Sequence, residues 1–293
     1  MTSWLVTGAT GLLGSDLVPE LRGAGHQVVA LGRRDLDITD RAAVARALAS
    51  ARPDVIVNAA AYTKVDDAEV HEAEALQING FGAEVLSAAC LELETPAVLL
   101  QISTDYVFDG TATTPYAEDA PTGPLSAYGR TKLIGEQAVL ATLPNTGYVI
   151  RTAWLYGEHG PSFVRTMANL ELVKDTLDVV DDQQGQPTST RDLSLRLREL
   201  GEQALAGQAP AGIYHASASG HTSKFGLAQA IFAGLGADPQ RVRPTTSDRF
   251  PLPAPRPAWS VLGHDRWAAA GLPPMRHWES ALADSLAAVA ARP

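Results

Sequence analysis

The sequence predicts an α/β protein with a doubly wound parallel sheet and a smaller C-terminal lobe. Two features of the chain indicate this fold. In its first half, short apolar runs alternate with longer segments of helical periodicity, the pattern of repeated strand–helix–strand units. A glycine-rich turn directly follows the first apolar run, where such sheets place their first connection from strand to helix.

The elements of the first half can be assigned in order from these patterns. Strands are expected at residues 4–7, 27–31, 55–57, 97–102 and 148–150, where short apolar runs occur. Helices are expected at residues 12–22, 41–50, about 69–93 and 128–141. The first helix should end at Gly23 and Gly25, and the second carries Val44 and Leu48 one turn apart.

The second half is less regular. It predicts helices at residues 163–172 and 192–205 and strands at residues 177–180 and 213–215. Four prolines between residues 251 and 257 exclude a regular helix there, so this stretch is expected to be a loop leading to the final segment. Residues 1–155 are expected to form the sheet domain with a contribution from about 210–240, and residues 156–293 mainly the smaller lobe.

Composition restricts the possible partners. The chain has 293 residues, with 23 Lys and Arg against 33 Asp and Glu and a net charge of -10, which argues against nucleic-acid or anionic-membrane binding. Its one cysteine, Cys90, cannot form an intramolecular disulfide. The first residues do not have the pattern of a signal peptide, and no apolar run approaches the roughly 20 residues of a membrane span. A cytoplasmic protein without a membrane partner is expected.

A glycine motif carries the first functional prediction. Gly8, Gly11 and Gly14 follow a predicted strand and open a predicted helix. Glycines let the backbone approach a pyrophosphate closely, and the helix N-terminus presents free N–H groups to it. The motif therefore predicts a Rossmann-like dinucleotide site. Arg33 and Arg34, after the second strand, suit the extra 2′-phosphate of NADPH and favour NADP over NAD.

A second motif suggests acid–base chemistry. Tyr128 and Lys132 are four residues apart, so they share one face of a helix. A nearby ammonium should lower the pKa of the phenol towards neutrality and help it exchange a proton. Upstream, Thr104 ends an apolar strand, where its hydroxyl would face the ligand crevice of an open parallel sheet.

Taken together, these motifs resemble the extended short-chain dehydrogenase/reductase family and, more narrowly, the dTDP-4-dehydrorhamnose reductases. The resemblance extends over essentially the whole chain, and the run of residues 102–110 is its most specific part. It also includes residues 58–63, 124–129, 151–157 and 182–188 and the Arg256-Pro257 pair.

The resemblance implies a reaction. NADPH would reduce the C4 ketone of dTDP-4-dehydro-L-rhamnose to give dTDP-L-rhamnose, a donor for cell-surface polysaccharide. The implied catalytic residues are Thr104, which would hold the carbonyl oxygen, Tyr128, which would supply the proton, and Lys132, which would tune Tyr128 and bind ribose. The partner would be a small nucleotide sugar, and the protein could form a homodimer.

The same resemblance, with the motifs above, assigns two sets of binding residues. The cofactor-binding set is Gly8, Thr10, Gly11, Leu12, Leu13, Gly14, Arg33, Asp37, Ile38, Ala59, Ala60, Ala61, Thr63, Tyr128 and Lys132. The substrate-binding set is Thr104, Asp105, Tyr106, Trp154 and Arg256. In this picture, residues 1–155 bind NADP and residues 156–293 mainly bind substrate.

The sequence departs from the family pattern in two places, and two other functions remain as alternatives to the reductase. Residues 187–191 lack the glutamate that some family members place at a magnesium-bridged dimer contact, and the histidines show no metal-ligand spacing, so magnesium is doubtful and no metal site is expected. Trp259 stands where the family often has asparagine. The alternatives are an epimerase or dehydratase of nucleotide sugars with the same fold, and a non-catalytic NADP-binding regulatory subunit.

Overall fold

A parallel sheet forms the centre of the protein. The computed structural model describes residues 1–291. Six strands pair in the order β10-β5-β4-β3-β1-β2, and every pairing is parallel. Their bounds are β1 Ser3–Thr7, β2 Gln27–Leu31, β3 Val55–Asn58, β4 Val98–Thr104, β5 Gly147–Thr152 and β10 Gly212–His215. The strand order reverses direction on either side of β1, which confirms the doubly wound sheet and places a ligand crevice outside the strand ends at this point.

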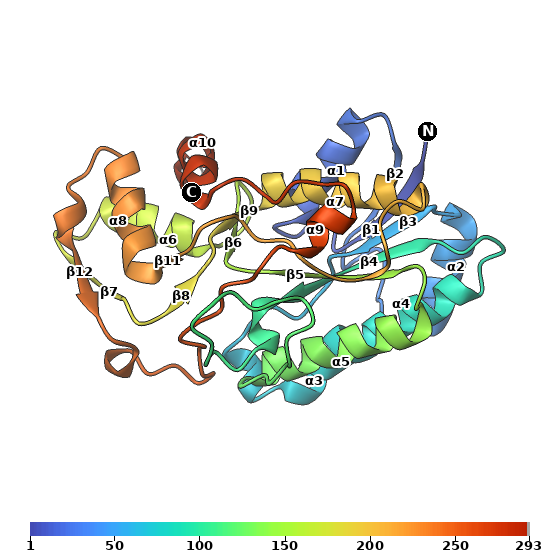
Figure 1. Ribbon diagram of the computed structural model, residues 1–293, viewed down its shortest axis with the longest axis horizontal. Helices are drawn as coiled ribbons and strands as arrows, with labels where there is room; N and C mark the ends of the chain where they lie inside the picture. The colour runs from blue at the N-terminus through green and yellow to red at the C-terminus, as the bar shows by residue number, and fades with distance from the viewer. Residues whose placement is uncertain (292–293) are drawn as a thin grey trace.

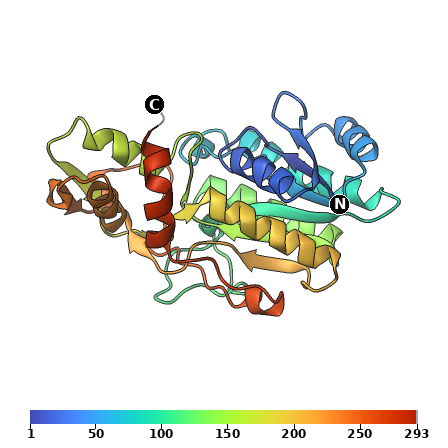
Figure 2. The same cartoon turned by 90° about the horizontal axis from the view of Figure 1, so that it is seen from above.

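Helices cover both faces of this sheet (Figure 1, Figure 2). One face packs on α1 (Gly14–Gly23), α7 (Thr190–Leu205) and the short α9 (Arg266–Ala269). The other packs on α2 (Arg41–Ala51) and α4 (Gly82–Leu91), with α5 (Ala127–Thr142) and the short α3 (Glu72–Leu76) alongside. Because both faces are buried, β3 is apolar along nearly its whole length, as parallel strands require.

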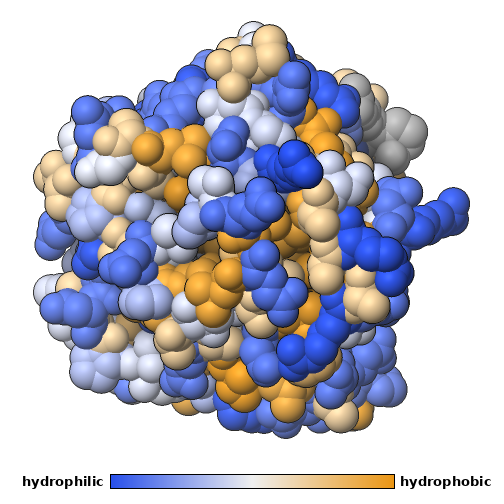
Figure 3. Space-filling model, turned by 90° about the vertical axis from the view of Figure 1, so that its right-hand side faces the viewer, coloured by the Kyte–Doolittle hydropathy of each residue, from blue (hydrophilic) through white to orange (hydrophobic). Residues whose placement is uncertain are grey.

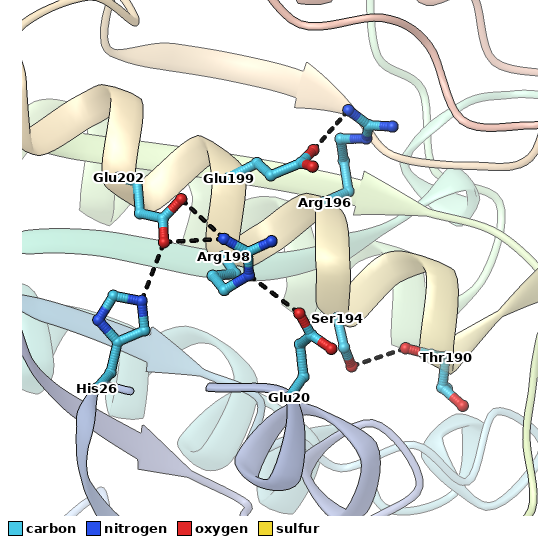
Figure 4. A network of polar contacts seen from close by, with 8 residues as sticks. All are labelled: Glu20, His26, Thr190, Ser194, Arg196, Arg198, Glu199 and Glu202. Atoms are coloured by element: carbon cyan, nitrogen blue, oxygen red, sulfur yellow. Dashed lines mark hydrogen bonds and ion pairs between the residues drawn. The ribbon is translucent and has the colours of Figure 1, made fainter. Parts of the chain in front are cut away.

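Charged side chains join α1 to α7 along their outer edge (Figure 4). Arg198 donates to Glu20 of α1 at 3.0 Å and to Glu202 one turn along α7 at 2.9 Å. His26, which follows α1, contacts the same Glu202 at 3.0 Å. These contacts are partly exposed, so the buried leucines of α7 provide most of the attachment of this helix to the sheet.

A smaller lobe has a core of its own. It is built from α6 (Phe163–Glu171), α8 (Lys224–Gly234) and α10 (Trp278–Ala290), with β7 (Leu177–Val180) paired to β12 (Val242–Thr245). Two short pairs lie between this lobe and the sheet: β6 (Leu155–Tyr156) with β9 (Thr188–Ser189), and β8 (Gln184–Gly185) with β11 (Thr222–Ser223). The lobe lies beyond the ends of β4 and β5 (Figure 1).

The second half of the chain contributes elements to both cores. Of the segment at about 210–240 that was expected to join the sheet domain, β10 lies in the sheet, whereas α8 packs in the smaller core. Two elements from the part expected to form mainly the smaller lobe, α7 and α9, pack on the sheet. The chain therefore passes between the two cores several times after residue 155.

The prediction of a single helix at about residues 69–93 is wrong. The segment is divided into α3, a π-helical turn at Gln77–Phe81, and α4. Within that turn, Asn79 is buried, and its amide binds the backbone of Tyr62 and the hydroxyl of Thr131. The π turn thus joins the loop after β3 to α5, a tertiary contact that sequence periodicity does not reveal.

No helix among residues 1–291 is long and apolar enough to cross a bilayer. On the face farthest from the smaller lobe, apolar side chains form small groups among hydrophilic ones (Figure 3).

Candidate active site

A cavity of about 1090 Å³ lies at the carboxyl ends of the central strands. Its walls come from the loop after β1, the ends of β3, β4 and β5, the start of α5, and the first residues of α6 and α8. It lies where the reversal in strand order opens a crevice. One wall therefore belongs to the sheet and the other to the smaller lobe.

The glycine loop forms the floor at the end of β1. Gly8 has a φ of 63°, and a Cβ there would lie 2.6 Å from the backbone of Ala59, so a side chain would separate the loop from β3. A Cβ on Gly14 would lie 2.4 Å from the carbonyl oxygen of Gly8. Leu13, at the N-terminus of α1, provides no side-chain cap, and the N–H groups of Ser15 and Asp16 in the first turn donate to the carbonyl oxygens of Gly11 and Leu13. The positive end of the helix dipole still faces the loop and favours an anion there.

Nearly all of the expected cofactor-binding residues lie on this cavity. Those lining it are Gly8, Thr10, Gly11, Leu12, Leu13, Arg33, Asp37, Ile38, Ala59, Ala60, Ala61, Thr63, Tyr128 and Lys132. Gly14 does not line it and instead allows the close packing of the loop. Of the two arginines, Arg33 lines the cavity, whereas Arg34 is exposed outside it.

Tyr128 and Lys132 project into the same cavity from the first turns of α5. The helix begins after Ser126, whose hydroxyl accepts a hydrogen bond from the N–H of Gly129 at 3.1 Å. The ammonium of Lys132 donates to the carbonyl oxygen of Ile102 in β4 at 2.6 Å. Burial lowers the pKa of Lys132 to about 8, although the charge of Glu136 acts in the opposite direction.

Thr104 completes this group at the end of β4. Its hydroxyl accepts from the N–H of Tyr106 at 3.2 Å, donates to Oδ1 of Asp105 at 3.0 Å, and lies near enough to the phenol of Tyr128 to have a lowering effect on the pKa of that phenol. Burial, and then the charge of Asp105, raise the pKa of Tyr128. The prediction that Lys132 lowers the pKa of Tyr128 is therefore wrong when only the groups of the protein are considered. The loss of hydration that burial imposes on the phenolate has the larger effect. A raised pKa keeps the phenol protonated, the form a proton donor needs.

The expected substrate-binding residues divide into two groups. Asp105, Tyr106 and Trp154 line the cavity together with Thr104. Arg256 is not among the lining residues, and its guanidinium binds both carboxylate oxygens of Asp66, at 3.0 and 2.7 Å. The ion pair joins the loop before α10 to the loop after β3.

Sequence reasoning missed Lys224, the first residue of α8. It lines the cavity, and its Nζ lies 3.3 Å from the ring centroid of Trp154. Burial lowers the pKa of Lys224 to about 7, whereas the charge of Asp105 raises it. No motif surrounds this lysine, and its partner Trp154 is distant in sequence, so only the folded chain reveals it.

Comparison with known proteins identifies the family. A family model described as the RmlD substrate binding domain matches residues 2–291. A protein of Streptomyces griseus named dTDP-4-dehydrorhamnose reductase is 57% identical over 289 residues, which cover 99% of this chain and 94% of that protein. The chain belongs to the dTDP-4-dehydrorhamnose reductase family. The resemblance found in the sequence motifs is thereby confirmed.

Other relatives of this reductase family differ in the sugar that they name. A Streptomyces niveus protein named dTDP-4-keto-6-deoxy-D-glucose reductase is 52% identical over 279 residues, covering 95% of this chain and 94% of that protein. The crystal structure of dTDP-4-dehydrorhamnose reductase from Bacillus anthracis, in complex with NADP, is 35% identical with a TM-score of 0.91 and covers 98% of this chain and 99% of that one.

Metal ligands are not gathered at the cavity or elsewhere in the described chain. Within residues 1–291, no group of three or more His, Cys, Asp or Glu side chains is arranged to hold a metal ion. The residues on the cavity wall instead offer hydroxyls, a phenol, ammonium groups and one buried carboxylate.

Proposed function

We propose that this chain is an NADPH-dependent reductase that converts the C4 ketone of dTDP-4-dehydro-L-rhamnose to the alcohol of dTDP-L-rhamnose. The observation that carries this proposal is the meeting of Thr104, Tyr128 and Lys132 with the glycine loop on one cavity. Family membership and the NADP complex of the Bacillus anthracis relative support it.

The cavity fits a dinucleotide cofactor. The backbone at Gly8 leaves no room for a Cβ, so a pyrophosphate could approach the loop closely, and the N-terminus of α1 would present the positive end of its dipole to it. Arg33 would hold the 2′-phosphate and Lys132 the nicotinamide ribose. When bound, NADPH supplies the hydride that reduces the ketone.

The chain's own residues would handle the carbonyl oxygen and the proton. The hydroxyl of Thr104 would hold the carbonyl oxygen, and Tyr128 would donate its phenolic proton to that oxygen as negative charge develops on it. The ketone thus gains a hydride at carbon and a proton at oxygen. Lys132 remains charged below its pKa of about 8 and, with the cofactor bound, would hold the nicotinamide ribose next to Tyr128.

A second substrate has specific support. The Streptomyces niveus relative is named for dTDP-4-keto-6-deoxy-D-glucose, which carries the same ketone at C4 on a sugar of different stereochemistry. We propose dTDP-4-dehydro-L-rhamnose as the main substrate because the Streptomyces griseus relative, which is named for this sugar, has the higher sequence identity to this chain.

A substrate panel tests the proposal. The purified protein is mixed with NADPH and either 4-keto sugar, and the absorbance of NADPH is followed. We expect stoichiometric oxidation and the larger kcat/KM with dTDP-4-dehydro-L-rhamnose. NADPH binding without oxidation by any 4-keto sugar would instead indicate a regulatory subunit, and sugar conversion without net oxidation would indicate an epimerase or dehydratase.

Arg33→Ser is expected to weaken selection for NADPH. Removing a charge-assisted hydrogen bond to the 2′-phosphate should lower kcat/KM with NADPH about tenfold or more and leave kcat/KM with NADH nearly unchanged. Arg34→Ser is the matched control, because Arg34 is the exposed neighbour outside the cavity. Equal kcat/KM for the two cofactors in the unchanged protein would remove this assignment.

We also propose a cytoplasmic location and a homodimer. The location is supported by the proposed use of NADPH and nucleotide sugars, which are cytoplasmic metabolites, and the dimer by the family resemblance. Light scattering coupled to gel filtration would test the oligomeric state, and a mass of one chain, 30.9 kDa, would contradict a dimer.

A further inference from the structure

The ammonium of Lys224 forms an unusual part of the cavity wall. Besides its contact with Trp154, Nζ lies 4.9 Å from the ring centroid of Phe163. Within residues 1–291, this ammonium makes no hydrogen bond or ion pair with another group. Three N–H donors on the cavity wall therefore remain available to a ligand.

Trp154 is held so that its ring supports this ammonium. The residue has a φ of 45°, a left-handed conformation that costs energy for a side chain of this size. Its indole lies against Gly185, where a Cβ would approach ring carbon Cε2 to 2.4 Å. While Lys224 occupies the ring face, a base or sugar cannot stack there. A substrate therefore meets the ammonium at this place.

Two buried oxygen atoms of the cavity lack partners. Neither Oδ2 of Asp105 nor Oγ1 of Thr152 has a partner at hydrogen-bond distance and angle among the described residues, and both residues line the cavity. The Ser260 side chain lies near enough to the Asp105 carboxylate to oppose in part the burial that raises its pKa, but it leaves Oδ2 without a full hydrogen bond. Asp105 is 1% exposed, and its other oxygen, Oδ1, accepts from the hydroxyl of Thr104 at 3.0 Å. Buried polar atoms without partners are rare because they lose their hydration, so these two point to a polar ligand.

We propose that Lys224 and Asp105 together bind one hydroxyl of the substrate's sugar ring, on C3, the hydroxyl-bearing carbon next to the ketone. A hydroxyl can accept a hydrogen bond from the ammonium and donate one to the carboxylate. The position follows from Asp105, which adjoins Thr104 in the chain and is hydrogen-bonded to it. This inference rests on the proposed function, since it takes the ligand to be a 4-keto sugar nucleotide.

The diphosphate of the substrate is the less suitable partner for this pair. Lys224 and Asp105 line the same cavity and their charges interact, so the negative charge of the carboxylate acts on any group bound at the ammonium. A diphosphate would be attracted by the first and repelled by the second, whereas a neutral hydroxyl uses both. The pair therefore favours the sugar over the phosphates.

Lys224→Met tests the proposal because it keeps most of the length and the apolar stem of the side chain and removes its charge. With NADP bound to the protein, calorimetry should show that affinity for dTDP-L-rhamnose falls about tenfold or more. Affinity for dTDP should change less than about twofold, and NADPH binding should stay unchanged. Lys174→Met is the matched control, because Lys174 is exposed and lies outside the cavity.

A dTDP-sugar without the C3 hydroxyl makes the test specific. The unchanged protein should bind this analogue as weakly as Lys224→Met binds dTDP-L-rhamnose, and the variant should bind the analogue no more weakly than the unchanged protein does. Asp105→Asn should give the same selective loss and provides a second route if Lys224→Met fails to fold.

Two results would overturn the proposal. Unchanged affinity for dTDP-L-rhamnose in Lys224→Met would remove this lysine from the site, and an equal loss for dTDP would assign it to the diphosphate. Because binding is measured without turnover, a protein that binds dTDP-L-rhamnose but oxidises no NADPH would contradict only the proposed function.

Discussion

Tyr128→Phe is expected to lower kcat for reduction of the 4-keto sugar roughly 100-fold or more. The phenol lies in the cavity beside Thr104, and its raised pKa keeps its proton available for the carbonyl oxygen. Phenylalanine retains the ring and removes only the hydroxyl that carries the proton. The rate is measured from NADPH oxidation at saturating substrate, and NADPH affinity from fluorescence titration, which should change little.

The control for this variant is Tyr116→Phe. Tyr116 stacks on Phe108 and does not line the cavity, so its hydroxyl would not contact a substrate bound there. We expect full kcat from this control. Full activity in Tyr128→Phe, with the fold intact, would show that another group supplies the proton.

Glu136→Gln is expected to lower the free energy of unfolding by about 3–5 kcal/mol. Glu136 and Arg151 are each 2% exposed, and Nη2 of the arginine lies 2.7 Å from Oε2 of the glutamate. Ser103 also donates to this carboxylate, at 2.5 Å. Replacing the Glu136 carboxylate by a neutral amide leaves the buried guanidinium of Arg151 without a counter-charge. A guanidinium cannot lose its proton to avoid this cost. Urea unfolding followed by circular dichroism measures the loss.

The surface pair of Arg41 and Glu84 provides the matched comparison. These side chains are 57% and 50% exposed, so Glu84→Gln should change the unfolding free energy by less than about 1 kcal/mol. If Glu136→Gln lowered the free energy of unfolding no more than Glu84→Gln does, the buried ion pair would contribute no more to stability than the surface pair.

Most of the central strands were predictable because burial on both faces gives them a continuous apolar run, as in β1 and β3, whereas the edge strand β2 is apolar although partly exposed. The predicted bounds of the central strands agree with the structure to within about two residues, and residues 27–31 agree fully. In the smaller lobe, the helix predicted at residues 163–172 agrees with α6, whereas α8 was harder to predict. α8 is apolar around most of its circumference and contains Gly226 and Gly234, so it shows no amphipathic period. The sequence pattern therefore predicts no helix at this place.

The candidate site was predictable where local sequence determines geometry. A glycine loop between strand and helix, and a tyrosine four residues before a lysine, each place their groups through backbone structure alone. Other features depend on contacts between distant segments. The pairing of Arg256 with Asp66, and the ammonium of Lys224 over Trp154, arise when loops and helices meet, and no local pattern encodes them.

One measurement tests most directly whether this cavity carries out hydride transfer to a sugar ketone. The protein is supplied with NADPH deuterated on either face of the nicotinamide C4, together with dTDP-4-dehydro-L-rhamnose, and the product is analysed by mass spectrometry and NMR. The account predicts one deuterium at C4 of the sugar from one of the two cofactors, with one NADPH consumed per sugar. A product without deuterium from either cofactor, or sugar conversion without net NADPH consumption, would contradict it.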